Sequence, residues 1–152
     1  MIQIINADIF TIKSNLLVHQ VNCRGVMGSG IAKVVREKYP QVYNSYVKEV
    51  KSALLGSASL LGYAQIVKIT DDFSICNLFG QNCYGRDGKR YTNYEALTIA
   101  FETINQNFSG QTVTIPYGLG CSLGGGNWEI VFTIIKETLK DCNVLICKKT
   151  NL

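Results

Sequence analysis

The sequence has 152 residues, of which 47% are hydrophobic and 17% are charged, and only two are prolines. This composition excludes a wholly disordered chain, because one compact domain over residues 1–152 can bury enough apolar surface to offset its conformational entropy. The net charge of +4 favours anionic ligands only weakly. No apolar run approaches the roughly 20 residues of a membrane span, and no charged segment precedes the first strand-like run, so we expect a cytoplasmic protein.

Short apolar runs rich in branched residues alternate along the chain with segments of helical period. Strands are expected at 2–5, 16–21, 64–69, 74–79, 112–115 and 144–147. Helices are expected from about Gly30 to Tyr39, from Pro40 to about Val50, and along two apolar stripes that run from Leu97 to Phe108 and from Trp128 to Leu139. This alternation predicts an α/β domain with a largely parallel sheet, and the aromatic residues of the stripes are expected in its core.

The cysteine pattern argues against a metal site. Six cysteines stand at positions 23, 76, 83, 121, 142 and 147, no two of them in C-x-x-C spacing, and His19 is the only histidine. We therefore expect no metal, and nothing in the sequence calls for a cofactor. Reduced cysteines that pack as small core residues are the favoured interpretation.

Two glycine-rich segments each join an expected strand to an expected helix: "NCRGVMGSG" at 22–30 and "YGLGCSLGGGN" at 117–127. In a parallel sheet both would lie at the carboxyl ends of strands, where open α/β sheets bind ligands. Glycine lets backbone N–H groups approach an anion without an intervening Cβ, so the two loops could hold two phosphates. Neither segment matches the Walker loop or the G-x-G-x-x-G fingerprint. Flexible connections without a ligand remain the alternative for each loop alone.

Six segments, in this order, resemble those of ADP-ribose-binding macrodomains: "NADIF", "VHQVNCRGVMGSGIA", "YPQVYNSY", "NLFGQ", "RYTNYEAL" and "IPYGLGCSLGGGNWEIV". The resemblance spans residues 6 to about 148. Within the family the sequence is most similar to the branch that holds ADP-ribose 1''-phosphate phosphatases and a glutamate-ADP-ribose glycohydrolase. The resemblance implies a three-layer α/β/α sandwich with a central mixed, largely parallel sheet.

The resemblance also implies roles for individual residues. Asp8 would accept a hydrogen bond from the adenine amino group beside the Ile9 backbone, although the same aspartate could cap a turn or a helix. The first glycine loop would wrap the distal ribose and one phosphate, and the second would cradle the diphosphate with backbone amides. The implied ligand-binding residues are Asp8, Ile9, Asn22, Gly28, Ser29, Gly30, Ile31, Gln81, Tyr117, Gly118, Leu119, Gly120, Cys121, Ser122 and Leu123.

His19 is the first candidate for catalysis, because its position resembles that of a general base or nucleophile in the phosphatase branch. A histidine hydrogen-bonded inside the core is the equal alternative. Asn22 could orient a water molecule or the ribose hydroxyls. Asn127 stands near the position where related sequences often carry an aspartate, but an amide cannot take a proton. Gln81 occupies the place of the glycohydrolase's lysine, which argues against that covalent route.

The segment 84–94 holds further candidates for the border of the site. Tyr91, Thr92 and Tyr94 are candidates to border the adenine or ribose pocket, although Tyr94 could instead belong to the core face of the helix that follows. Three basic residues form a loop that could meet phosphate or could be a solvated turn: Arg86, Lys89 and Arg90.

The leading hypothesis is a macrodomain that binds ADP-ribose and hydrolyses the phosphate of ADP-ribose 1''-phosphate, as a phosphoric monoester hydrolase. The alternative is a non-catalytic macrodomain that recognises or sequesters ADP-ribose or a related NAD-derived nucleotide. Hydrolysis of ADP-ribose from proteins or nucleic acid ranks below both, with ADP-ribosylated macromolecules as possible partners. Direct nucleic-acid binding is not expected, because the basic residues form no stripe with interleaved aromatics, and we expect a monomer.

Overall fold

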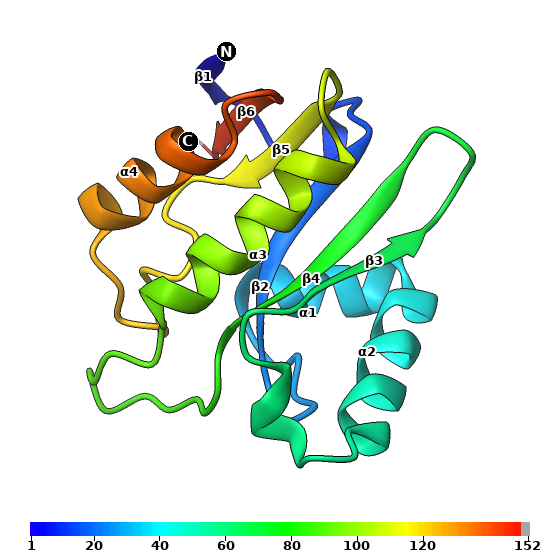
Figure 1. The fold of residues 1–152 in the computed structure, drawn as a ribbon, viewed down its shortest axis with the longest axis vertical. Coiled ribbons are helices and arrows are strands. Elements are labelled where there is room, and N and C mark those ends of the chain that lie inside the picture. Colours follow the sequence, from blue (N-terminus) through cyan, green and yellow to red (C-terminus); the bar gives the residue numbers. More distant parts are fainter. Residues whose placement is uncertain (150–152) are drawn as a thin grey trace.

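A mixed six-stranded sheet forms the centre of the protein in the computed structural model, which describes residues 1–149 (Figure 1). The strand order is β1-β6-β5-β2-β4-β3, and only the edge strand β3 runs antiparallel to its neighbour. Residues 150–152 of the predicted domain lie outside the described part. The strands are β1 (Ile2–Asn6), β2 (Leu16–Asn22), β3 (Ala64–Lys68), β4 (Ser74–Gln81), β5 (Thr112–Pro116) and β6 (Asn143–Lys148).

Four α-helices cover the two faces of this sheet, so the fold is a three-layer α/β/α sandwich (Figure 1). Helices α1 (Gly30–Lys38) and α2 (Pro40–Ser52) lie on one face, and α3 (Tyr94–Asn107) and α4 (Trp128–Thr138) lie on the other. Pro40 stands in the first turn of α2, where its missing N–H costs no hydrogen bond. Two short 3-10 helices complete the fold, η1 (Ile9–Thr11) and η2 (Ser57–Leu60).

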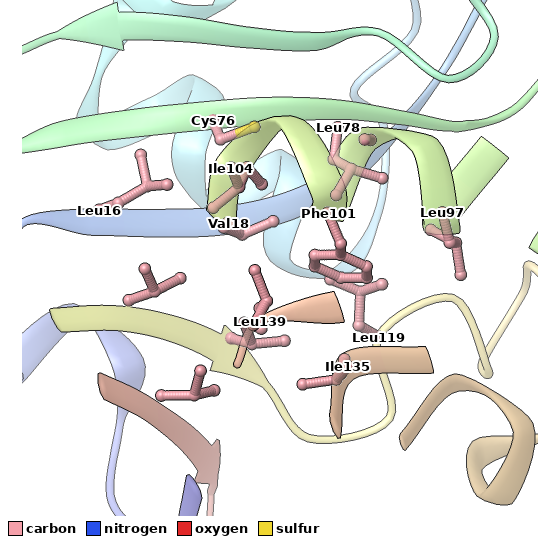
Figure 2. Packing of buried hydrophobic residues seen from close by; sticks show 14 of the residues in the cluster. Leu16, Val18, Cys76, Leu78, Leu97, Phe101, Ile104, Leu119, Ile135 and Leu139 are labelled. Atoms are coloured by element: carbon pink, nitrogen blue, oxygen red, sulfur yellow. The ribbon is translucent and has the colours of Figure 1, made fainter. Parts of the chain in front are cut away.

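The hydrophobic core lies on both sides of β2 because successive side chains of a strand point to opposite faces. Leu16 and Val18 join the cluster under α3 and α4, where Phe101 is fully buried (Figure 2). Leu17 points to the opposite face and packs with Val35 of α1. Burial of apolar surface on both faces holds β2 in the middle of the sheet and fixes where its carboxyl end lies.

The predicted α/β pattern is confirmed, with each strand within two residues of its expected bounds. The six cysteines are unpaired, and four of them are buried. Within residues 1–149, no group of histidine, cysteine and carboxylate side chains could hold a metal ion. None of the described helices is long and apolar enough to span a membrane.

The parallel strands bring their carboxyl ends to one edge of the sheet. At that edge the register of β2 and β4 shifts between Val21 and Asn22, because Asn22 pairs with Gln81 and Gly80 is skipped. A side chain at Gly80 would meet Gln20 and Leu97. An irregularity of this kind bends the strand and increases its twist locally, here at the end of the sheet where the candidate site lies.

Candidate functional site

A cavity of about 550 Å³ opens at the carboxyl ends of β2, β4 and β5. Both glycine-rich segments border it, as the parallel topology requires. Thirteen of the predicted site residues line the cavity: His19, Asn22, Gly28, Ser29, Gly30, Ile31, Gln81, Tyr117, Gly118, Leu119, Gly120, Ser122 and Leu123.

The first glycine loop is held by Asn22 and by Tyr46 of α2. The Asn22 side chain accepts from the Arg24 backbone N–H at 2.9 Å and donates to the Val26 carbonyl at 2.9 Å. The buried Tyr46 hydroxyl lies 2.7 Å from Asn22 Oδ1 and accepts from the Gly25 and Val26 N–H groups at 3.0 and 3.1 Å. Burial raises the pKa of Tyr46 above its usual value, so the hydroxyl keeps its proton. The polar atoms of Asn22 therefore organise the loop itself.

Beyond this loop, the N-terminus of α1 borders the cavity. Ser29 is the N-cap residue, but its side chain makes no capping hydrogen bond. Gly30 has a positive φ of 59°, and a Cβ there would meet nothing within 4 Å. Free N–H groups at a helix start carry partial positive charge and favour an anion, so this end of α1 can receive a phosphate.

The second loop is a series of tight turns, and its glycines have two separate roles. Gly118 has a φ of 78°, and a Cβ there would meet nothing within 4 Å, so its backbone is open to a ligand. Gly120, by contrast, packs so closely that a Cβ would lie 2.8 Å from Gln20 Oε1. At Gly124 and Gly126 a Cβ would lie 2.7 and 2.8 Å from the Gly120 carbonyl oxygen. The close packing of the loop therefore gives a second reason for glycine at 120, 124 and 126, beside the phosphate contact expected from the sequence.

A polar network ties this loop to the sheet. The Gln20 amide group donates to Gln81 Oε1 at 2.7 Å and to Thr92 Oγ1 at 2.9 Å. Thr92, which is buried, donates in turn to the Gly120 carbonyl at 2.7 Å. The network holds the second loop against the carboxyl end of β2.

His19 lines the cavity from the α2 face of the sheet and is only 1% exposed. Its Nε2 lies 2.6 Å from Asn77 Oδ1 on the neighbouring strand, and its buried Nδ1 has no hydrogen-bond partner within the described residues. Burial lowers the pKa of His19 to about 4, and the hydrogen bond to Asn77 opposes this shift. The side chain is therefore neutral near pH 7. It is buried and hydrogen-bonded, as expected of a core histidine, and it also lines the cavity, as expected of a catalytic one.

Four predicted site residues do not line this cavity. Asp8 follows β1, accepts from the Phe10 N–H at 3.0 Å and lies 3.7 Å from Lys149 Nζ. It caps η1, the alternative role drawn from the sequence. Ile9 is buried and borders a separate cavity of about 700 Å³.

The other two predicted site residues outside the cavity wall are Cys121, in the second loop, and Asn127, at the end of that loop. Cys121 is half-buried against the core, and burial raises the pKa of its thiol. Asn127 caps α4 by accepting from the Glu129 N–H at 2.9 Å, and its own N–H donates to the Tyr94 hydroxyl at 3.0 Å. The structure therefore does not bring Asn127 together with His19 in the cavity wall.

Arg86 is the one formally charged residue among those that line the cavity in the described part of the chain, and no carboxylate lines it. Gln20 could have been indicated by its position at the carboxyl end of an expected strand, two residues before the first glycine loop. The remaining lining residues are apolar or carry little signal in the sequence. Arg86 was a candidate of the basic loop, whereas Lys89 and Arg90 do not line the cavity. The lining residues that the sequence did not indicate are Gln20, Val21, Val26, Ala32, Tyr84, Gly85, Pro116 and Gly124.

No family model matches the sequence. Among curated proteins, the chain is 34% identical over 67 residues to an ADP-ribose 1''-phosphate phosphatase of Meyerozyma guilliermondii, covering 42% of this chain and 38% of that protein. It is 28% identical over 128 residues to a DNA ADP-ribosyl glycohydrolase of Mycobacterium tuberculosis, covering 83% of this chain and 35% of that protein. The chain thus spans little more than a third of the length of these relatives.

Solved structures share the fold over nearly the whole chain. A Bacteroides thetaiotaomicron protein has a TM-score of 0.86 at 25% identity, covering 97% of this chain and 98% of its own. The macrodomain of Mycobacterium tuberculosis DarG has a TM-score of 0.77 at 24% identity, covering 99% of both chains. Thermosipho africanus DarTG in complex with ADP-ribose has a TM-score of 0.80 at 20% identity, covering 99% of this chain and 43% of that one.

Proposed function

We propose that this chain, which has the macrodomain fold, binds ADP-ribose in the cavity between its two glycine loops. The observation that carries the proposal is that both loops border one cavity that has Arg86 but no carboxylate in its described wall. Such a wall suits a dianionic pyrophosphate, because backbone N–H groups and one guanidinium attract it and no like charge opposes it. A solved neighbour with the same fold is described in complex with ADP-ribose, which supports this choice of ligand.

The pyrophosphate would lie between the start of α1 and the open backbone at Gly118. The distal ribose would then lie near His19, below the first loop. Adenine would extend toward Asp8, which follows β1 at the same sheet edge but outside the cavity wall. For Asp8 to accept from adenine, its contact with Lys149 must give way, and an exposed ion pair of 3.7 Å opposes this only weakly.

We further propose that the protein hydrolyses ADP-ribose 1''-phosphate. A water oxygen would form a bond to phosphorus while the bond from phosphorus to the 1''-oxygen breaks, which releases inorganic phosphate and ADP-ribose. His19 Nδ1 would take the proton of the attacking water and return one to the leaving oxygen. His19 is the only side chain in the described wall that ordinarily titrates near neutral pH. The 34% identity to a protein named as this phosphatase supports the assignment.

Two measurements test these proposals separately. Calorimetry with ADP-ribose tests binding, and the absence of heat at micromolar to millimolar ligand would overturn the whole proposal. Release of inorganic phosphate from ADP-ribose 1''-phosphate tests catalysis. We expect His19→Gln to abolish phosphate release while ADP-ribose still binds.

A binding module without catalysis is the second candidate function. It is favoured by the absence of any carboxylate among the lining residues of the described chain, because the wall then has no aspartate or glutamate to orient or activate water. Tight ADP-ribose binding with no phosphate release from wild-type protein would establish this candidate and remove the phosphatase.

Hydrolysis of ADP-ribose from nucleic acid is a third candidate. Its support is the 28% identity over 128 residues to a protein named as a DNA ADP-ribosyl glycohydrolase. The Gln81 amide, however, is not a nucleophile, and it is held between Gln20 and the Cys83 carbonyl. Incubation with ADP-ribosylated DNA, followed by chromatography of free ADP-ribose, would test this activity directly.

A further inference from the structure

A chain of side-chain amides leads from α2 through β3 and β4 to His19. The Gln65 Nε2 donates to the Ser45 carbonyl at 3.0 Å, which leaves Gln65 Oε1 to accept from Asn77 Nδ2 at 3.0 Å. Asn77 Nδ2 also donates to the Val42 carbonyl at 3.3 Å. Because backbone carbonyl oxygens only accept, both amide groups are oriented with their NH₂ groups toward these partners.

This orientation determines the tautomer of His19. The NH₂ group of Asn77 is committed to Val42 and Gln65, so Asn77 Oδ1 is the atom that faces His19 Nε2, at 2.6 Å. An amide oxygen cannot donate, so Nε2 carries the hydrogen. A neutral imidazole has one N–H, and Nδ1 is therefore left with a free lone pair. That atom is buried and has no partner among the described residues.

We infer that Asn77 and Gln65 are positioning residues that hold His19 in the Nε2–H tautomer, so that Nδ1 accepts a hydrogen bond from a hydroxyl group or water molecule in the cavity. Buried polar atoms in proteins nearly always have a partner, so an acceptor without one, on a residue that lines the cavity, indicates a donor supplied from the cavity. That this donor belongs to ADP-ribose, or to the water that attacks its phosphate, rests on the proposed function.

The use of amides in place of carboxylates has a specific consequence. A carboxylate opposite a histidine stabilises the imidazolium, whereas an amide oxygen fixes the ring without balancing a positive charge. His19 is therefore held neutral at rest, as an acceptor that can begin by taking a proton. An imidazolium at this place would instead present an N–H donor at Nδ1, because its Nε2–H would still be bonded to Asn77 Oδ1.

Nitrogen NMR of histidine tests this inference, because His19 is the only histidine in the sequence. With ¹⁵N-histidine incorporated into the full chain, every imidazole signal reports this one ring. At pH 7 we expect a protonated, pyrrole-like Nε2 and a bare, pyridine-like Nδ1. The opposite tautomer or an imidazolium in the wild-type protein would overturn the inference.

Three variants separate positioning from general structural support. Asn77→Asp should convert the ring to an imidazolium at pH 7. Gln65→Met should raise the share of the opposite tautomer, because only the 3.3 Å hydrogen bond to the Val42 carbonyl then orients the Asn77 amide. Asn107→Asp makes the same chemical change on the exposed surface of α3 and should leave the His19 signals unchanged. An unchanged Nε2–H signal in folded Asn77→Asp protein would count against the role of Asn77.

Titration with ADP-ribose distinguishes failure of this inference from failure of the proposed function. A change of the Nδ1 signal on saturation is expected if the ligand, or water held with it, donates to that nitrogen. Saturable binding without such a change would refute the acceptor role. Absence of binding would refute the proposed function, and the tautomer of the free protein would still decide the assignment of Asn77 and Gln65.

Discussion

The Thr92 hydroxyl donates to the Gly120 carbonyl at 2.7 Å and joins the loop before α3 to the second glycine loop. The same hydroxyl accepts from the Gln20 amide at 2.9 Å, so one buried side chain connects β2, the segment before α3 and the loop that borders the cavity. Backbone bonds reinforce this junction, because the Tyr91 and Thr92 N–H groups both donate to the Gly124 carbonyl. The wall of the cavity therefore depends on residues that do not themselves line it.

Replacing Thr92 by valine removes this hydroxyl and keeps the shape of the side chain. We expect Thr92→Val to lower the free energy of unfolding by about 1–3 kcal/mol, because the Gln20 amide and the Gly120 carbonyl lose a buried partner. We also expect weaker ADP-ribose binding, since the second loop is less firmly held. Urea unfolding and calorimetry would measure the two effects.

Thr103→Val is the matched control, because Thr103 is exposed on α3 and its hydroxyl bonds only to the preceding turn of its own helix. It should leave binding unchanged and alter stability by no more than about 0.5 kcal/mol. Equal stability losses for the two valine variants would contradict the structural role given to Thr92.

Alanine substitutions at two glycines with similar φ values separate the cost of backbone strain from the cost of close packing. Gly88 and Gly125 have φ values of 76° and 70°, so alanine is strained at both. A Cβ at Gly88 would meet nothing within 4 Å, whereas at Gly125 it would lie 2.5 Å from the Lys89 carbonyl oxygen. We expect Gly88→Ala to cost about 1 kcal/mol of unfolding free energy and Gly125→Ala clearly more, because backbone must shift to admit its methyl group. Equal losses in thermal or urea unfolding would show that close packing is not what requires glycine at 125.

The strands and helices could be predicted from the sequence because their signals are local. Apolar runs between turn residues gave the strands, and Leu97 to Phe108 gave α3 by its period of three and four. The edge at which the glycine loops meet followed from the parallel arrangement alone. The positions of these elements follow from apolar residues that recur every few positions, so a short segment of sequence is enough to detect them.

The cavity wall was harder to predict because its partners are far apart in the sequence. The contacts of Asn22 with Tyr46 and of His19 with Asn77 join residues 24 and 58 positions apart. No local pattern indicates that Asn22 would be used within its own loop, or that Asn77 would set the tautomer of His19. Asn127 looked like a catalytic candidate because it stands beside the glycines, but its position at the start of α4 makes it a helix cap.

Arg86 provides a test of the electrostatic part of the site. It lines the cavity, whereas Lys89 of the same exposed loop does not. We expect Arg86→Gln to weaken ADP-ribose binding about 5- to 30-fold, or roughly 1–2 kcal/mol, because a charged hydrogen bond to phosphate is lost. Lys89→Gln makes the same change of charge and should weaken binding less than about 3-fold, by loss of long-range attraction alone. Calorimetry at two salt concentrations would separate the variants, and similar losses for both would mean that Arg86 acts only through net charge.

The buried His19 makes the stability of the protein depend on pH in a defined direction. Its pKa is lowered from 6.5 to about 4 by burial, so the unfolded chain binds a proton more readily than the folded protein between these values. The contribution of neutral His19 to stability is therefore fully present above about pH 6.5 and is lost as the pH falls toward 4. Between pH 7 and pH 5 we expect a loss of about 2 kcal/mol from this group alone.

A comparison of urea unfolding for wild-type and His19→Gln protein at pH 7, 6 and 5 isolates this contribution. No other histidine titrates in this window, since the sequence has only one, and most carboxylates titrate below pH 5. The free energy of unfolding of the wild-type protein should fall by about 2 kcal/mol relative to that of His19→Gln between pH 7 and pH 5, because glutamine takes up no proton. Parallel curves would mean that the folded protein binds the proton as readily as the unfolded chain. His19 would then be accessible to water or to a charged partner, and the burial that lowers its pKa would have to be abandoned.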